Sequence, residues 1–189
     1  MERTVAQGAA KLTYEDYLLI PDDGMRHELI DGEHFVSPAP QMRHQRVLIR
    51  LLYEIETFLR QSGLGELFVA PTDVVFTRFD VVEPDLLYIS KARAEIVGTA
   101  NVGGAPDLVI EILSPSNRRY DEMKKRDLYD RTGVPEYWIV DPEAETVKVF
   151  RRDGERFGRP LLLSAHDGDA LASPQLPGLA VPLSAIFLP

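Results

Sequence analysis

The segment at residues 107–113, DLVIEIL, constrains the fold most, because it places one glutamate inside an apolar run. In a strand the side chains alternate, so Ile110 and Ile112 face one side of the sheet. Val109 and Glu111 face the other side. Both faces are therefore largely apolar, which is typical of a strand covered on both sides. The segment predicts a central strand of an α/β fold.

The other segments predict helices and strands around this strand. Helices are predicted at 13–19, 44–61 and 117–131, and strands at 67–70, 73–76, 84–89 and 136–141. HELIDGEHFVSP predicts a β-hairpin that turns at Asp31-Gly32. Thr13 and Ser116 are the expected helix N-caps. Beyond residue 142, short strands are expected around turns at Asp153-Gly154 and Asp167-Gly168.

This order of elements predicts an α/β protein with a mixed central sheet flanked by helices. We expect a single domain over residues 1–189, which is a common size for one domain. Residues 1–12 are expected to be flexible, about 25–142 to form the core, and 143–189 to form a C-terminal β extension. Additional strands are thus expected at both the N-terminal and the C-terminal side of the core.

Composition excludes several classes of protein. The sequence has no cysteine, which excludes disulfides and thiolate zinc sites and is typical of a reducing cytoplasm. It has no apolar stretch near the roughly 20 residues that span a bilayer, and no signal-peptide pattern at its start. We therefore expect a soluble, cytoplasmic protein with no membrane partner. The net charge of -9 disfavours tight nucleic-acid binding unless the positive charges are clustered.

Two acidic residues in consecutive predicted strands are candidates for chemistry. An ionised carboxylate such as that of Glu111 is not left in an apolar strand without a cation, a hydrogen bond or a proton. A buried ion pair with an arginine would explain Glu111 equally well. Asp85 opens the strand after Pro84, where an aspartate is often only a turn residue. If the two strands are neighbours, both acids could chelate one hard divalent ion.

A lysine in the helix at 117–131 is the third candidate. At 100° per residue, Lys125 projects within roughly ten degrees of the mean direction of Leu128 and Tyr129, which define the inward face. Lys124 falls about ninety degrees away from that direction. Lys125 is therefore the lysine predicted to face the sheet. The alternative is a lysine whose stem packs beside Tyr129 while its amine reaches water.

A long ordered block resembles a known family. The run PDLVIEILSPSNRRYDEMKKRDLYDRTGVPEYWIVDP at residues 106–142, preceded by EPDLLYI and HELIDGE, resembles the Uma-two family of endonuclease-like proteins. The resemblance extends from LTYEDYLLI to LPGLAVPLSAIF, which is nearly the whole chain. That family is assigned to the PD-(D/E)XK restriction-endonuclease-like fold. The resemblance therefore implies this fold, metal-dependent cleavage of nucleic acid, and a homodimer.

The resemblance also implies roles for individual residues. Asp85 matches the aspartate of the PD element, and Glu111 matches the acidic residue of (D/E)XK. Leu113 stands where the lysine of that motif is usual. The Uma-two proteins supply the lysine from the following helix instead, and Lys125 matches that place. The resemblance thus implies a catalytic set of Asp85, Glu111 and Lys125, in agreement with the helical geometry.

Further residues are expected to support this set. Glu28 and His44 match family-typical positions, and Glu28 would complete the acidic cluster or bond to the lysine. A histidine at a helix start is more often structural, which is the alternative for His44. Asp107 shares a strand face with Glu111, although its position beside Pro106 also fits a turn. Phosphate contacts are predicted for the arginines of the two helices, with a solvated helix face as the alternative. These are Arg43, Arg46, Arg50, Arg118, Arg119 and Arg126.

The predicted function is hydrolysis of phosphodiester bonds in nucleic acid, with DNA as the expected substrate and one or two Mg²⁺ or Mn²⁺ ions held by Asp85 and Glu111. Lys125 would position water or stabilise charge on phosphorus. The competing prediction is a non-catalytic, dimeric binding or regulatory protein on the same fold. The acidic net charge and the displaced lysine favour this alternative.

Overall fold

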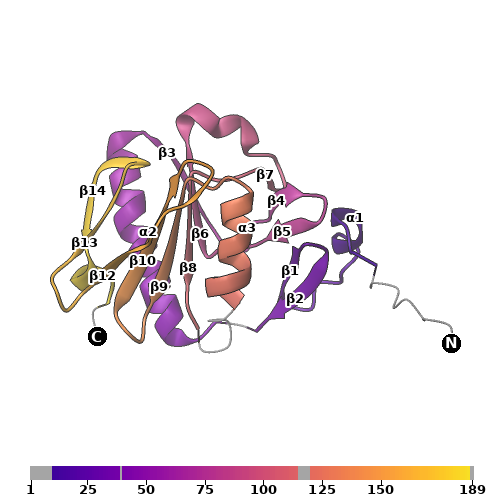
Figure 1. Cartoon of the computed structure of the whole chain (residues 1–189), viewed down its shortest axis with the longest axis horizontal. Coiled ribbons are helices and arrows are strands. Elements are labelled where there is room, and N and C mark those ends of the chain that lie inside the picture. Colours follow the sequence, from indigo (N-terminus) through magenta and orange to yellow (C-terminus); the bar gives the residue numbers. More distant parts are fainter. Residues whose placement is uncertain (1–9, 39, 115–119, 188–189) are drawn as a thin grey trace.

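The central sheet of the chain is mixed, and it carries the segment 107–113 in its interior. The structure, a computed structural model, describes residues 10–38, 40–114 and 120–187. The strands of the central sheet are β3 (Gly65–Val69), β6 (Leu86–Ser90), β8 (Leu108–Ile112), β9 (Glu136–Asp141), β10 (Thr146–Asp153), β11 (Arg156–Phe157) and β12 (Leu161–Ser164). Their order is β11-β10-β9-β8-β6-β3, and β12 also pairs with β10. Only the pairing of β8 with β9 is parallel among these described strands (Figure 1).

A second sheet is formed by the N-terminal half of the chain. Its strands are β1 (Arg26–Ile30), β2 (Glu33–Ser37), β4 (Val74–Thr77), β5 (Asp80–Val82) and β7 (Val102–Gly103), in the order β2-β1-β5-β4-β7. The strands β1 and β2 form the predicted hairpin, and Asp31 and Gly32 at its turn both have positive φ. A third sheet consists of β13 (Ala170–Ser173) and β14 (Leu176–Pro182).

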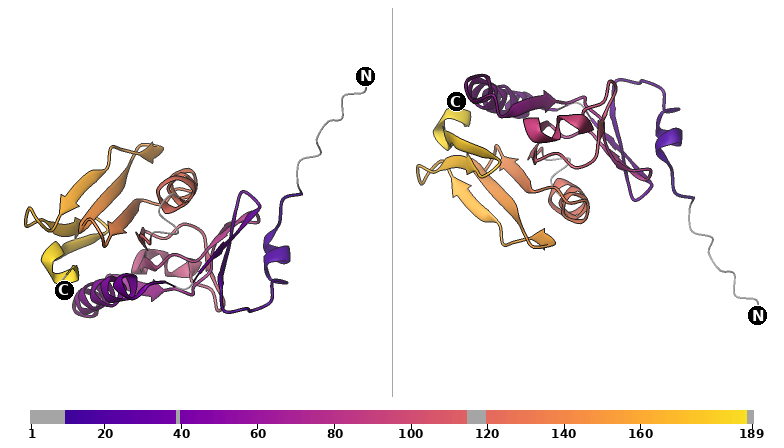
Figure 2. Two further views of the ribbon diagram at one scale, coloured as in Figure 1. Left: turned by 90° about the horizontal axis from the view of Figure 1, so that it is seen from below. Right: turned by 90° about the horizontal axis from the view of Figure 1, so that it is seen from above.

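The helical segments are α1 (Tyr14–Tyr17), α2 (Met42–Ser62), the 3₁₀ segment η1 (Lys91–Ile96), the π-helix η2 (Tyr120–Lys125), α3 (Arg126–Arg131) and α4 (Leu183–Ile186). Helix α2 covers one face of the central sheet and α3 covers the other, whereas α1 lies beside the N-terminal sheet (Figure 2). No helix in the described ranges is long and apolar enough to cross a membrane.

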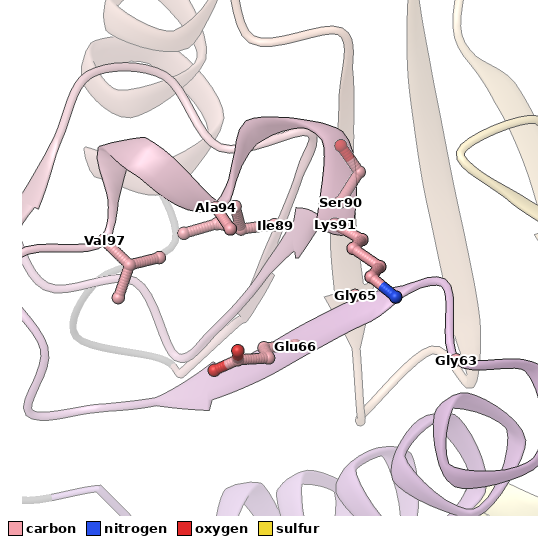
Figure 3. A pocket seen from close by; sticks show the side chains of 8 residues that line it. All are labelled: Gly63, Gly65, Glu66, Ile89, Ser90, Lys91, Ala94 and Val97. Carbon is pink, nitrogen blue, oxygen red and sulfur yellow. The ribbon is translucent and has the colours of Figure 1, made fainter.

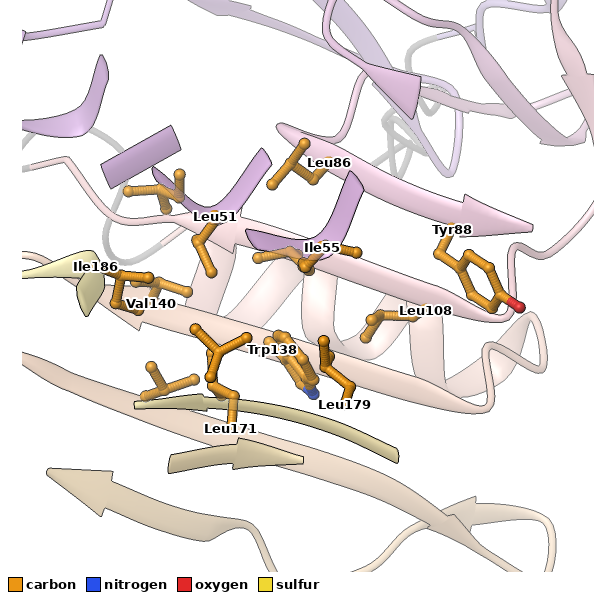
Figure 4. Packing of buried hydrophobic residues seen from close by; sticks show 14 of the residues in the cluster. Leu51, Ile55, Leu86, Tyr88, Leu108, Trp138, Val140, Leu171, Leu179 and Ile186 are labelled. Carbon is orange, nitrogen blue, oxygen red and sulfur yellow. The ribbon is translucent and has the colours of Figure 1, made fainter. Parts of the chain in front are cut away.

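Two apolar clusters fill the space on either side of the central sheet. Alternating residues of β8 divide between them, with Ile110 in one cluster and Val109 in the other. The first cluster packs the sheet against α2, β13, β14 and α4, with Trp138 near its centre (Figure 4). The second cluster packs the central sheet against the N-terminal sheet and against α3, which contributes Leu128 and Tyr129. The predicted coverage of β8 on both faces is therefore confirmed.

Helix α2 shows how local sequence sets an element. Its buried residues recur at helical spacing, and Gly63 ends it in the left-handed conformation with its N–H bonded to the carbonyl of Leu59. The buried residues of α2 are His44, Val47, Leu48, Leu51, Ile55 and Leu59. The short helix α1 likewise begins with the predicted cap, because Thr13 and Asp16 form a reciprocal capping box.

Several predicted boundaries were wrong. Val102–Gly103, where no strand was predicted, forms strand β7 beside β4. The helix expected at 117–131 is a π-helix over Tyr120–Lys125 and becomes α-helical only at Arg126. The predicted cap Ser116 and the first turn of that helix lie outside the described residues. Strand β5 and helix α4 were not predicted, because each is only three or four residues long.

The C-terminal strands contribute to the main core. Strand β10 pairs with β9 along six residue pairs and so extends the central sheet. Leu171, Leu176 and Leu183 of the last elements are fully buried against α2 and the sheet. The segment predicted as an extension at 143–189 thus closes one face of the core. The turn at Asp167-Gly168 joins two strands that belong to different sheets.

Candidate active site

Strand register brings Asp85 and Glu111 to the same end of the central sheet. Asp85 immediately precedes β6, which runs antiparallel to β8 with Leu86 opposite Ile110. The residue before Leu86 therefore lies level with Glu111. Both side chains are almost fully buried and line one small cleft. The two acids singled out from the sequence thus meet at one point of the fold.

Lys125 lies at the centre of a buried ion cluster. Its Nζ atom is 2.9 Å from Oε1 of Glu111 and 2.8 Å from Oε1 of Glu28. The hydroxyl of Tyr129 donates to the same Glu111 oxygen at 2.6 Å. Lys125 is 2% exposed, whereas Lys124 is exposed and pairs with a carboxylate of β2. The helix therefore directs the predicted lysine, and not its neighbour, into the sheet.

The hairpin strand β1 supplies two further charged groups to the cleft. Arg26 and Glu28 stand two residues apart, so they face the same side of the strand. Nη1 of Arg26 donates to Oδ1 of Asp85 at 3.0 Å, and Oε1 of Glu28 also accepts the N–H of Glu83 at 2.9 Å. The hairpin thus links the aspartate and the lysine of the site.

Asp85 is held by donors on three sides. Besides Arg26, Nε2 of His44 lies 2.9 Å from its Oδ2, and the N–H of Ile112 donates to the same oxygen at 2.8 Å. Burial alone would raise the pKa of Asp85. The hydrogen bond to His44 and the charges of His44 and Arg26 outweigh burial and lower the pKa to about 2. Asp85 is therefore ionised at neutral pH.

The buried carboxyl groups of the site outnumber its fixed cations. The carboxyls belong to Glu28, Asp85, Glu111 and Asp121, and the cations are Lys125, Arg26 and, when it is protonated, His44. Burial raises the pKa of Glu111 against the attraction of Lys125, and the charges of Asp85 and Glu28 add to this rise. Burial also raises the pKa of Asp121 well above its usual value. Such an excess of negative charge is balanced by bound protons or by a cation.

The oxygen atoms that line the cleft are of the types that a hard divalent ion prefers as ligands. The cleft has a volume of about 20 Å³, which is room for one water-sized sphere. Carboxylate and backbone carbonyl oxygens are the ligands that Mg²⁺ and Mn²⁺ prefer. In the described part of the chain, no three Asp, Glu or His side chains converge as a ligand set. Asp85 and Glu111 would therefore need backbone or water oxygens to complete the coordination.

Asp107 does not join this site, contrary to the prediction. It shares the strand face of Glu111, but it stands four residues earlier, or roughly 13 Å along the strand. Its carboxylate accepts the N–H of Ser90 at 2.8 Å and pairs with Arg93 at 3.1 Å. Asp107 therefore ties the opposite end of β8 to the end of β6.

The arginines predicted to contact phosphate fall into separate places. Arg43 and Arg46 lie in the first two turns of α2, and both are exposed. Arg126 is exposed at the start of α3. Arg118 and Arg119 lie outside the described residues.

Sequence reasoning missed three residues of the site, although each had a signal. Arg26 precedes Glu28 by two positions in a predicted strand, which places both on one face. Asp121 precedes Lys125 by four positions in a helix, and it is buried with its carboxylate 3.9 Å from the lysine. Tyr129 was used only to define the inward face, yet its hydroxyl bonds to Glu111. A buried lysine or glutamate requires such partners.

A larger cavity lies elsewhere and does not match this chemistry. It has a volume of about 260 Å³ and opens between α2, the start of β3 and η1, where Gly65 passes close to the backbone of Ile89 (Figure 3). Glu66 and Lys91 are the charged residues that line it, and both are at least partly exposed. The small acidic cleft is therefore the stronger candidate, despite its smaller volume.

Comparison with known proteins places the chain in a family. The model of the Uma2 family, described as "Putative restriction endonuclease", matches residues 14–184. The crystal structure of a "putative nuclease belonging to DUF820" from Anabaena variabilis superposes with a TM-score of 0.79 at 20% identity, covering 93% of this chain and 97% of that chain. No curated protein matches the sequence. The mixed α/β fold is thus shared with that nuclease-like structure, and the chain belongs to the Uma2 family.

Proposed function

We propose that this chain is a nuclease of the PD-(D/E)XK type that hydrolyses phosphodiester bonds of DNA with Mg²⁺ or Mn²⁺. One observation carries the proposal: Asp85 and Glu111, from adjacent strands, face one cleft beside the buried ammonium of Lys125. Leu113, which stands in the usual lysine position, is buried and apolar. Lys125 would take over the role of that lysine from the following helix.

Asp85, Glu111 and a backbone carbonyl near Ile112 would hold the divalent ion. When bound, such an ion polarises the phosphate and lowers the pKa of a bound water. The excess of buried carboxyl groups over fixed cations supports this assignment, because a divalent cation would neutralise it. One ion fits the small volume of the cleft better than two.

Lys125 would orient the attacking water or stabilise the charge that develops on the phosphate. An ammonium group has three N–H donors, and Glu111 and Glu28 lie within hydrogen-bond distance of it. One donor is left for a water or a phosphate oxygen. Glu28 acts as a positioning residue, since it pairs with the ammonium of Lys125 and is itself fixed by the N–H of Glu83.

Asp85 is positioned by two residues of the same cleft. His44 and Arg26 both contact its carboxylate, which keeps it ionised and fixes its orientation. His44 reaches the carboxylate from the first turn of α2. We propose that His44 is a positioning residue and not the general base, because its Nε2 is already directed at Asp85.

The test is cleavage of plasmid and single-stranded DNA by the purified protein, with and without Mg²⁺ or Mn²⁺. We expect divalent-dependent cleavage that is lost in Glu111→Gln and in Lys125→Met. Lys124→Met is the matched control, because the adjacent lysine is exposed and lies outside the cleft. Circular dichroism confirms that each variant is folded. Wild-type cleavage by folded Glu111→Gln and Lys125→Met would show that the assignment is wrong.

A specific observation favours a second candidate, a non-catalytic binding or regulatory protein. Asp85 and Glu111 are already engaged by Arg26, His44 and Lys125, so the cluster can serve as a structural ion network. Titration with Mn²⁺ separates the two candidates. A melting temperature that stays constant over the titration would favour the binding protein, because any ligand of the folded state raises it.

A homodimer and a cytoplasmic location complete the proposal. Leu161 and Leu162 on β12 are exposed at the margin of the central sheet, and such an apolar edge supports pairing with a second copy. The lack of cysteine supports a reducing compartment. Light scattering after size-exclusion chromatography tests the dimer, and cell fractionation tests the location.

A further inference from the structure

We propose that a groove beside the acidic cleft holds the phosphate backbone of an unpaired nucleic-acid strand next to the bond that is cut. This inference rests on the proposed function and assigns where the substrate binds. The groove has a volume of about 520 Å³, within the range of ligand sites. It is lined by Arg43, Arg46 and Arg50 of α2, by Pro142 and Glu145 after β9, and by Phe187.

The groove and the cleft open at the same edge of the central sheet. Strands β8 and β9 run parallel with Ile112 level with Val140, so Ser114 and Pro142 follow at the same height on neighbouring strands. Ser114 lines the cleft, and Pro142 lines the groove. Neighbouring strands lie only about 4.8 Å apart.

Helix α2 joins the two sites in a second way. His44 lines the acidic cleft, while the residues on either side of it in the same turns, Arg43 and Arg46, line the groove. One helical turn rises only about 5.4 Å. A strand that leaves the cleft along α2 therefore meets the arginines of this helix within about one turn.

The acidic cleft cannot supply affinity for a polyanion by itself. Its cations, Lys125 and Arg26, are paired with carboxylates, and the whole chain carries a net charge of -9. Binding of nucleic acid depends mainly on cations that neutralise phosphates. The three guanidinium groups along one side of α2 form the cluster of positive charge that such binding requires.

The arginines of the groove differ in their engagement. Arg43 pairs with Glu145 at 3.6 Å, but both side chains are about half exposed, so water and phosphate can compete for the guanidinium. Arg50 donates to the carbonyl of Ile186 at 3.4 Å. Within the described ranges, Arg46 has no hydrogen-bond or ion-pair partner. Arg46 is therefore the group most available to a phosphate.

The apolar part of the groove favours an unpaired strand over a duplex. Val47, Pro142 and Phe187 line it beside the arginines. In a duplex the bases are stacked inside, so an apolar lining beside the phosphate track would have little to contact. Single strands expose their bases, which stack on aromatic and apolar side chains while cations follow the backbone.

Binding of short fluorescein-labelled single-stranded DNA, followed by fluorescence anisotropy without added divalent ions, tests the inference. Arg46→Gln and Arg43→Gln/Arg46→Gln are compared with Arg60→Gln, which removes the same charge at the far end of the same helix. We expect Arg46→Gln to weaken binding about tenfold. We expect the slope of log K against log salt to fall by about 0.7 for each groove arginine removed. Arg60→Gln should leave both unchanged.

The outcomes separate this inference from the proposed function. If the wild-type protein cleaves DNA but Arg43→Gln/Arg46→Gln binds it as tightly as Arg60→Gln does, the groove is not the nucleic-acid site and the nuclease proposal stands. If the groove variants lose binding but cleavage does not depend on Glu111, the groove stands and the nuclease proposal fails. The third measurement uses labelled duplex DNA of the same sequence. Tighter binding of the duplex than of the single strand would contradict the inference that the groove holds an unpaired strand. Labelled RNA, if bound with the same arginine dependence, supports the groove.

Discussion

Two buried glutamates on neighbouring strands have opposite surroundings. Glu136 begins β9, and its carboxylate accepts from Trp138 Nε1 at 2.7 Å, Ser173 Oγ at 2.6 Å and Arg151 Nε at 3.2 Å. Glu111 lies near the end of β8, the strand beside it, and faces a lysine that is shared with other carboxyls. Both glutamates are at most 1% exposed.

The difference shows how a structural charge is told from a functional one. The partners of Glu136 are neutral donors and one arginine, which satisfy both of its oxygens. Burial raises the pKa of Glu111, and the charges of its neighbours Asp85 and Glu28 add to this rise. Acidic groups that are buried together despite their mutual repulsion are typical of a functional site. Burial alone does not make that distinction.

The largest expected effect is on Lys125. Lys125→Met should lower the free energy of unfolding by about 3–5 kcal/mol, because it leaves buried carboxylates without their shared cation. Chemical denaturation measures this change. The double variant Lys125→Met/Glu111→Gln should recover part of the loss. An unchanged unfolding free energy in Lys125→Met would mean that the cluster is already neutral through bound protons.

The two glutamates themselves should respond in opposite ways. Glu136→Gln should cost about 1–3 kcal/mol of stability, because Arg151 and Ser173 lose an ionised acceptor, and it should leave cleavage unchanged. Glu111→Gln should reduce cleavage by roughly 10²–10³. Its effect on stability should be smaller than that of Glu136→Gln, since Lys125 keeps Glu28 and repulsion is relieved. Equal losses of cleavage in Glu111→Gln and Glu136→Gln would contradict the distinction between a functional Glu111 and a structural Glu136.

The pH dependence of stability should report Asp85. Its pKa in the folded state is lowered from 3.8 to about 2, so its contribution is present above pH 3.8 and is lost as the pH falls toward 2. The shift corresponds to about 2 kcal/mol. Denaturation of wild type and Asp85→Asn at several pH values measures it. The difference in unfolding free energy should shrink below pH 4, and a difference independent of pH would contradict the proposed contacts.

The smallest expected effect is on the neighbouring lysine. Lys124→Ala removes an exposed pair with Glu33, in which both side chains are more than half accessible. Such pairs contribute about 0.2–1 kcal/mol. The melting temperature should therefore fall slightly and cleavage should not change. A loss as large as that of Lys125→Met would show that this helix does not distinguish its two lysines.

Much of the fold could be predicted from local patterns. The apolar spacing of α2 and the cap at Gly63 gave its limits, and the turn at Asp31-Gly32 gave the hairpin. The π-helix before α3 could not be predicted, since its local sequence is equally compatible with an α-helix; its buried residues are Asp121 and Lys125. The three-residue strand β5 is too short to show a pattern of its own, and it pairs both with the adjacent β4 and with the distant β1.

The candidate site was predictable where a residue broke the pattern of its element. Glu111 in an apolar strand and Lys125 on an inward helix face were such cases. Asp107 was misplaced because alternation fixes the face of a strand but not the position along it. Arg26 was missed because an arginine in an edge hairpin breaks no pattern. Its role follows only from the approach of β1 to Asp85.

The binding of Mn²⁺ tests the central claim most directly. Titration calorimetry of wild type, Glu111→Gln and Glu136→Gln, in two buffers of different ionisation enthalpy, measures both the metal and the protons released. Wild type and Glu136→Gln should bind Mn²⁺ with release of protons, because burial raises the pKa of Glu111 and of Asp121 and so favours their protonated forms in the metal-free cleft. Glu111→Gln should not bind. No binding by wild type, or equal binding by Glu111→Gln, would contradict a metal centre at these acids.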